Sequence, residues 1–197
     1  MTPATSVPHR AALFALCERV PADCPWAVTA SENLALRGFD VMPGDVDVTT
    51  TAAGAHRIAT LFSDRVVRDV VPPTEAETET IRSHFGALSL NGTEVELMGD
   101  VEHRAREGLA PPPGAGDPVE GGEWIPDPPV GEVREFLAVE GHEVPVMPLS
   151  YEAFGYRARG EPDRAAAVEA RLADDRATDG GGDDDPRPSR PRAGATR

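Results

Sequence analysis

The carboxylates best placed to act together lie in two short segments of this sequence. In residues 45–48, Asp45 and Asp47 alternate with Val46 and Val48. Successive side chains of an extended strand point to opposite faces, so the two aspartates project together and the valines project to the other side. A later run with the same alternation puts Glu96 on the polar face of a second strand. If the two strands are neighbours, Glu96 completes a cluster of three carboxylates.

Three carboxylates held close together repel one another and need a compensating positive charge. Oxygen ligands suit hard divalent cations such as Mg²⁺. The pattern therefore predicts a metal site made by Asp45, Asp47 and Glu96. The alternative is that these acids only solvate the outer face of a half-buried sheet, in a chain that is acidic throughout.

Ser31 follows the short apolar run 26–29 and precedes a helical segment. A serine in this place can act as the N-cap of the helix. Its hydroxyl, with the backbone N–H groups at the start of the helix, can also hold a phosphate. The sequence leaves both roles open.

Apolar periodicity predicts the elements that must position these residues. We expect strands at residues 26–29, 45–49 and 65–71, and helices at 9–20, 34–38, 52–62, 149–159 and 161–172. Asn91-Gly92 joins two β-patterned runs, 85–90 and 93–98, and Asn-Gly favours the positive φ angles of a type I′ hairpin turn.

A second hairpin is expected at residues 136–146, around Glu140-Gly141. Pro145 lies in its second run, and because proline has no N–H to donate to a ladder, it predicts an edge strand.

The chain reads as one domain over residues 1–175, with a disordered tail at 176–197. Proline and glycine crowd residues 107–133, which favours an insertion that runs over the surface as a loop. The tail is rich in Gly, Asp, Pro and Arg, so it cannot bury enough apolar area to offset its ordering entropy.

Composition excludes several kinds of chemistry. The 197 residues include 34 Asp and Glu against 19 basic residues, all arginine, which gives a net charge of −15. Without lysine there is neither a Walker A lysine nor a Schiff-base anchor for pyridoxal phosphate. The charge disfavours wrapping nucleic acid. The composition is also typical of salt-adapted organisms, in which ~1 M salt shortens the Debye length to about 3 Å and weakens that argument.

Cellular location is also suggested by the sequence. No apolar run reaches the ~18 residues that cross a bilayer, and the N-terminus lacks the pattern of a secretory leader. Cys17 and Cys24 are read as two unpaired thiols. We therefore expect a cytoplasmic protein with no membrane partner.

The spacing of these motifs resembles a known superfamily. Thr29-Ala30-Ser31, the acid-x-acid run at 45–48 and the later strand with Glu96 resemble the DNA polymerase β-like nucleotidyltransferases. In those proteins a Gly-Ser or Gly-Gly turn opens a helix, an acid-x-acid strand follows, and another strand bears a third acid. Segments 81–86, 94–100 and 146–152, with Tyr156, are similar to the small stand-alone branch, which includes minimal nucleotidyltransferases and aminoglycoside adenylyltransferase-like proteins. The resemblance spans about Val20 to Leu172 without the insertion.

This resemblance implies an α+β fold, with a mixed β-sheet that carries helices on one face and is followed by C-terminal helices. It implies transfer of a nucleoside monophosphate from a nucleoside triphosphate to an acceptor hydroxyl, with release of pyrophosphate. Two Mg²⁺ ions, or Mn²⁺ in their place, would be held by the catalytic residues Asp45, Asp47 and Glu96. The nucleotide would contact Ala30, Ser31, Arg82 and His84.

The chain departs from the family at Ala30, where glycine is usual and permits close approach of the backbone to a triphosphate. This substitution keeps a second hypothesis open, a catalytically weakened protein that acts as a binding or antitoxin-like partner of another protein. Modification of an RNA end is a third. The sequence does not select among a small molecule, a protein and an RNA end as the acceptor.

Overall fold

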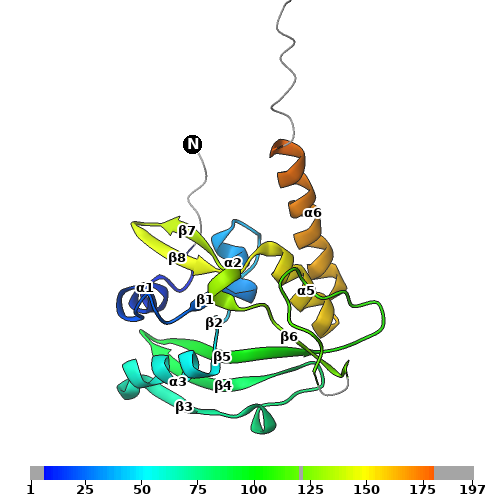
Figure 1. The fold of residues 1–197 in the computed structure, drawn as a ribbon. Coiled ribbons are helices and arrows are strands. Elements are labelled where there is room, and N and C mark those ends of the chain that lie inside the picture. The colour runs from blue at the N-terminus through cyan, green and yellow to red at the C-terminus, as the bar shows by residue number, and fades with distance from the viewer. Residues whose placement is uncertain (1–6, 120–121, 180–197) are drawn as a thin grey trace, which may run out of the picture.

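The computed structural model describes residues 7–119 and 122–179, which form one mixed sheet with helices packed around it (Figure 1). The strands are β1 (Trp26–Thr29), β2 (Val46–Thr50), β3 (Val66–Val71), β4 (Ile81–Leu90), β5 (Thr93–Arg104), β6 (Trp124–Pro126), β7 (Glu135–Val139) and β8 (His142–Val146). The helices are α1 (Arg10–Arg19), α2 (Ala30–Leu36), α3 (Ala52–Leu61), α4 (Val130–Val133), α5 (Leu149–Arg159) and α6 (Pro162–Asp179), with 3₁₀ turns η1 (Ser63–Arg65) and η2 (Pro73–Glu75). The strand order is β3-β4-β5-β2-β1-β8-β7, and β6 pairs with the far end of β5.

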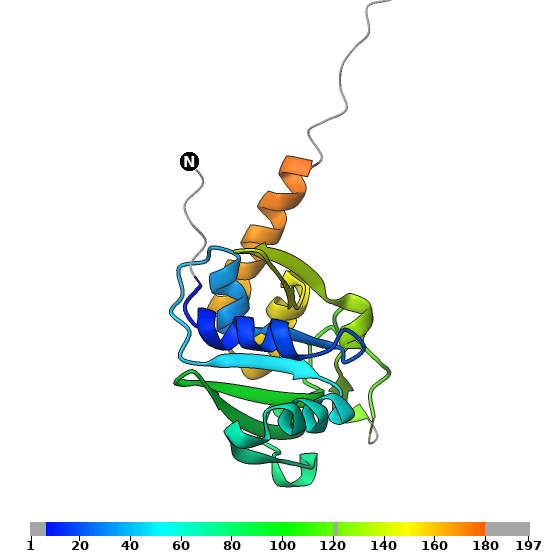
Figure 2. The same cartoon turned by 90° about the vertical axis from the view of Figure 1, so that its left-hand side faces the viewer.

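Helices α1 and α3 cover one face of the sheet, as Figure 2 shows. Leu16 of α1 and Ile58 of α3 are fully buried in the same cluster as Val48 and Leu97 of the central strands. Burying a side chain of this size contributes about 1.5–3 kcal/mol. Because the apolar side chains of β2 and β5 point into this core, alternation leaves the polar side chains of the same strands on the opposite face.

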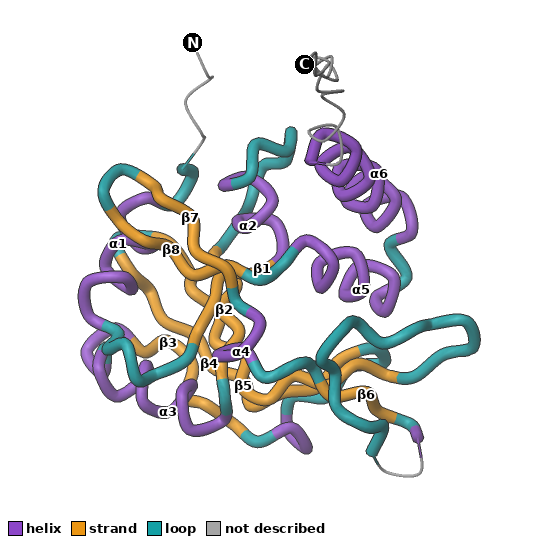
Figure 3. Tube along the Cα trace, turned by 45° about the horizontal axis from the view of Figure 1, so that its top comes forward, coloured by secondary structure: helices purple, strands orange, loops and turns teal. Residues whose placement is uncertain are grey.

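Helices α5 and α6 lie on the side of the sheet away from α1 and α3 (Figure 3). They pack with α2 in a second apolar cluster that includes Leu34, Leu149, Tyr156 and Val168. The α+β fold with a mixed sheet and C-terminal helices is therefore confirmed.

The Asn-Gly hairpin is also confirmed, because Asn91 and Gly92 have φ angles of 52° and 85° between β4 and β5. The second hairpin forms, but the prediction that its Pro145 strand is an edge was wrong. Strand β8 lies between β1 and β7, and it pairs with β1 at Val28↔Val146. Because this parallel pairing starts after Pro145, the missing N–H breaks no ladder bond to β1.

The predicted loop at 107–133 is partly regular. Trp124 and Ile125 form β6, are 1% and 3% exposed, and pair with β5. Two buried apolar side chains thus fix part of a segment whose proline and glycine content predicts a loop.

At the other end, α6 continues to Asp179, past the point where a tail was predicted to begin. The rest of that predicted tail, residues 180–197, lies outside the described residues. In the described part of the chain, no helix combines the length and the apolar character needed to cross a membrane.

A candidate nucleotide-binding active site

The two acid-bearing strands are direct neighbours. Strands β2 and β5 run parallel with Asp47 paired to Glu96, and Asp45 immediately precedes β2. One ligand oxygen from each of Asp45, Asp47 and Glu96 lies within 4.8 Å of the others. All three residues are half-buried. The structure therefore brings together the three carboxylates that the alternation singled out.

The environment of this cluster disfavours three negative charges. Burial raises the pKa of Asp47 to about 7, and the charges of Asp45 and Glu96 add to the shift. Burial also raises the pKa of Glu96, with Asp45 the next cause. A bound cation would relieve both effects. The donor set, three carboxylates at close range, fits a hard divalent ion such as Mg²⁺.

The turn from β1 into the first residue of α2 adopts an unusual conformation. Ala30 has a φ angle of +56°, in the left-handed region that favours glycine. Glu152 of α5, only 2% exposed, holds this turn. It accepts hydrogen bonds from Thr29 Oγ1 at 2.9 Å, Ala30 N at 3.0 Å and Asn33 Nδ2 at 2.6 Å. Burial raises the pKa of Glu152 to about 7, and these donors oppose the shift.

A cleft of about 750 Å³ lies on the open face of the sheet. Ala30, Ser31, Asp47 and Glu96 all line it. Three arginines that sequence reasoning missed also line it, from β3, α5 and the first turn of α6: Arg68, Arg159 and Arg164. No local pattern could have found them, because the topology alone brings these elements to one cleft.

Two of these arginines form one assembly at the α5–α6 corner. Glu161 bridges them, with Oε1 3.2 Å from Arg159 Nε and Oε2 2.9 Å from Arg164 Nη1. Both guanidinium groups lie over the ring of the buried Tyr156, 4.7 and 5.6 Å from its centroid. The positive charge of Arg159 opposes the rise in the pKa of Asp47, so Arg159 acts electrostatically on the carboxylate cluster.

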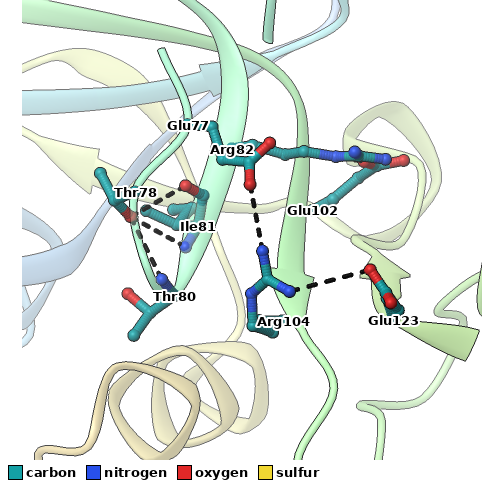
Figure 4. Close-up of polar contacts among 8 residues, drawn as sticks. All are labelled: Glu77, Thr78, Thr80, Ile81, Arg82, Glu102, Arg104 and Glu123. Carbon is teal, nitrogen blue, oxygen red and sulfur yellow. Dashed lines mark hydrogen bonds and ion pairs between the residues drawn. The ribbon is translucent and has the colours of Figure 1, made fainter. Parts of the chain in front are cut away.

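Arg82 and His84, predicted to bind nucleotide, do not line the cleft. Ser83 and Phe85, which alternate with them along β4, do. Arg82 forms an ion pair with Glu102 and lies 4.5 Å from the centroid of the Trp124 ring, and Figure 4 shows it beside Glu102. The His84 ring makes an edge contact with His56 of α3. The structure therefore gives no cleft contact for these two residues, and their role in nucleotide binding stays a prediction.

Comparisons with known proteins agree with this geometry. A family model described as aminoglycoside-2''-adenylyltransferase matches residues 12–172. The crystal structure of a candidate nucleotidyltransferase from Thermotoga maritima is 31% identical, with a TM-score of 0.61 over 82% of this chain and 91% of that chain. The structure of the Helicobacter pylori protein JHP933 is 9% identical, covers 86% of this chain and 92% of that chain, and has a TM-score of 0.29. Among curated proteins, none matches.

Proposed function

This chain belongs to the aminoglycoside-2''-adenylyltransferase family of nucleotidyltransferase-like proteins, and on that premise we propose that it transfers a nucleoside monophosphate from a nucleoside triphosphate to an acceptor hydroxyl. The observation that carries the proposal is the cluster of Asp45, Asp47 and Glu96, whose ligand oxygens lie within 4.8 Å of one another beside a large cleft. Acids that only solvated a sheet would not need to be half-buried and close together, nor would they have the raised pKa values of Asp47 and Glu96.

Asp45, Asp47 and Glu96 would hold Mg²⁺. Bound there, the metal would offset the charge of the triphosphate and lower the pKa of the acceptor hydroxyl.

The reaction is an in-line displacement at phosphorus. The acceptor oxygen forms a bond to the α-phosphorus as the bond from that phosphorus to the bridging oxygen breaks. Pyrophosphate leaves with the bonding electron pair, and a carboxylate of the cluster takes up the hydroxyl proton. Arg159 and Arg164 supply two cations on the cleft wall for the β- and γ-phosphates. Ser31 and Ala30 line the same cleft beside Asp47 and contact the nucleotide in this proposal.

The test uses purified protein, Mg²⁺ and each of the four common nucleoside triphosphates labelled at the α-phosphate, with pools of hydroxyl-bearing small molecules, proteins and RNA. We expect Mg²⁺-dependent nucleotide binding, label transfer to one pool and release of pyrophosphate. Asp47→Asn should abolish transfer, while the exposed Asp69→Asn, outside the cleft, should not change it. Transfer at the wild-type rate in Asp47→Asn would contradict the proposal, and nucleotide binding without transfer to any pool would indicate a binding protein instead.

A further inference from the structure

A row of apolar side chains crosses the open face of the sheet inside the cleft. Val71 of β3 pairs with Phe85 of β4, and Phe85 pairs with Met98 of β5. All three line the cleft and remain partly exposed. We call Val71, Phe85 and Met98 the apolar ladder. Nothing in the nucleotide or metal chemistry above accounts for it.

The ladder starts next to the carboxylate cluster. Met98 follows Glu96 by two residues on β5 and shares its face of the strand, which puts their Cα atoms about 7 Å apart. The strand order β4-β5-β2-β1 puts the rest of the ladder on one side of the cluster and the Ala30 turn, at the end of β1, on the other. The carboxylates therefore divide the cleft into two halves.

The chemistry assigns these halves to different substrates. In an in-line displacement the attacking oxygen and the leaving pyrophosphate lie on opposite sides of the phosphorus. With the nucleotide at Asp47 and the Ala30 turn, the acceptor approaches across the Glu96 side, over the ladder. We propose that the ladder holds the apolar face of the acceptor, which is a hydroxylated ring compound with one largely apolar face. This inference rests on the proposed function.

Charge along this half is mixed, with three carboxylates, Glu75, Glu77 and Glu96, and one cation, Arg68, in the lining. The Arg68 guanidinium lies 5.1 Å from the centroid of the Phe85 ring, so a fixed positive charge lies over the ladder. At the rim, Glu77 pairs with Arg104 at 3.0 Å (Figure 4), which compensates its charge. Glu75 is a second carboxylate in the cleft lining.

The rim is also built in advance of any ligand. Thr78 Oγ1 donates to Ile81 O at 2.9 Å and accepts from Ile81 N at 3.0 Å, which closes the turn that leads into β4 (Figure 4). Ile81 and Thr78 both line the cleft. A rigid rim beside an apolar floor suits a rigid ring better than a flexible polyamine.

The binding test uses 2-naphthol, a fluorescent hydroxylated ring, titrated into the full-length protein. Two nearly isosteric polar substitutions probe the ladder, Met98→Gln and Val71→Thr. Their matched controls are Met42→Gln, at a side chain 90% exposed, and Val67→Thr, at one 62% exposed, both outside the cleft lining. We expect each ladder variant to weaken 2-naphthol binding about tenfold and the controls to leave it unchanged. Thermal melts establish that each variant is folded.

In transfer assays with 2-naphthol or cyclohexanol as acceptor, the ladder variants should raise the acceptor KM and leave the Kd for the Mg²⁺–nucleotide complex unchanged. Weaker nucleotide binding in Met98→Gln would place the nucleobase on the ladder and overturn the inference. So would tighter binding of the polyamino sugar kanamycin than of 2-naphthol, or no 2-naphthol binding at all. Asp47→Asn should still bind 2-naphthol. If the wild type binds 2-naphthol but transfers no nucleotide, the proposed function is rejected and the binding role of the ladder is retained.

Discussion

Glu152 and Ala30 are 122 residues apart in sequence, and the Glu152 carboxylate accepts the Ala30 N–H at 3.0 Å while Ala30 has a φ angle of +56°. A left-handed conformation costs an alanine about 1–2 kcal/mol. The same carboxylate also binds Thr29 Oγ1 and Asn33 Nδ2. Hydrogen bonds to Glu152 of α5 thus hold a backbone conformation that favours glycine.

Ala30→Gly should therefore stabilise the protein, by about 1 kcal/mol, because glycine adopts positive φ without the Cβ penalty. This is opposite to the effect expected had Ala30 been an ordinary helical residue. Urea unfolding of both proteins measures the difference. Ala59→Gly, in the interior of α3, is the control and should destabilise by about 0.5–1 kcal/mol. A loss of stability in Ala30→Gly would show that the left-handed strain is not relieved by glycine.

Stability should depend on pH through Asp47. Its pKa is raised from 3.8 to about 7 in the folded protein, so the folded state binds a proton more tightly than the unfolded state does. The free energy of unfolding should then rise as pH falls through 7, by about 1.4 kcal/mol per pH unit for one proton, and the full gain is present below the unfolded pKa. Urea unfolding in EDTA at pH 7.5 and 6 measures the slope.

Glu152, with a pKa raised to about 7, contributes in the same direction, so the informative quantity is a difference between proteins. Asp47→Asn should have a shallower slope than wild type, whereas Asp69→Asn should keep the wild-type slope. Equal slopes in wild type and Asp47→Asn would reject the raised pKa of Asp47.

Metal should stabilise the protein through the same cluster. We expect millimolar Mg²⁺ to raise the Tm of the wild type, because the ion binds only where the folded chain gathers Asp45, Asp47 and Glu96. In EDTA, Asp45→Asn and Asp47→Asn should be as stable as the wild type or slightly more so, since each removes one repelling charge. Both should lose the Mg²⁺ shift. Calorimetry with and without Mg²⁺ is the measurement, and an undiminished shift in both variants would place the ion elsewhere.

The α5–α6 arginines give a prediction about the nucleotide. Arg164→Gln should weaken Mg²⁺–nucleotide binding about tenfold, because it removes a cation from the cleft wall that can form charge-assisted bonds to phosphate. Arg157→Gln is the matched control, since Arg157 pairs with Glu169 on the exposed side of the same helices and does not line the cleft. Isothermal titration with a non-hydrolysable nucleotide compares them, and equal affinities in the two variants would remove Arg164 from the phosphate site.

The carboxylate cluster could be predicted from the sequence because the alternation of acidic and apolar residues is a local pattern. Alternation along each strand fixes the face on which Asp47 and Glu96 lie, and their pairing follows from two central strands that each bury an apolar face. Along β4, Ser83 and Phe85 line the cleft, whereas Arg82 contacts Trp124 and His84 contacts His56.

The rest of the site depends on long-range topology. Glu152 has no sequence signal for its role, because its partners Thr29, Ala30 and Asn33 lie at the far end of the chain. Arg68 reaches the cleft only because β3 becomes an edge strand two positions from β5. In β6, pairing with β5 forms a strand and buries Trp124, although the surrounding proline and glycine predict a loop.

If the cleft is divided as proposed, Glu96 is the residue at which turnover and nucleotide binding should separate. Glu96 lies on β5, between the ladder and Asp47, whereas Asp47 lies on β2, the strand nearer the Ala30 turn, and Asp45 immediately precedes that strand. Glu96→Gln should therefore lose most transfer activity and leave nucleotide affinity within about threefold, because the carboxylate acts at the acceptor side. Glu94→Gln, two residues earlier on the same strand and outside the cleft lining, should retain both. Single-turnover rates and equilibrium titrations on the same preparations separate the two effects. A parallel loss of affinity and rate in Glu96→Gln would mean that all three carboxylates act on the nucleotide, and the two-sided assignment of the cleft would fail.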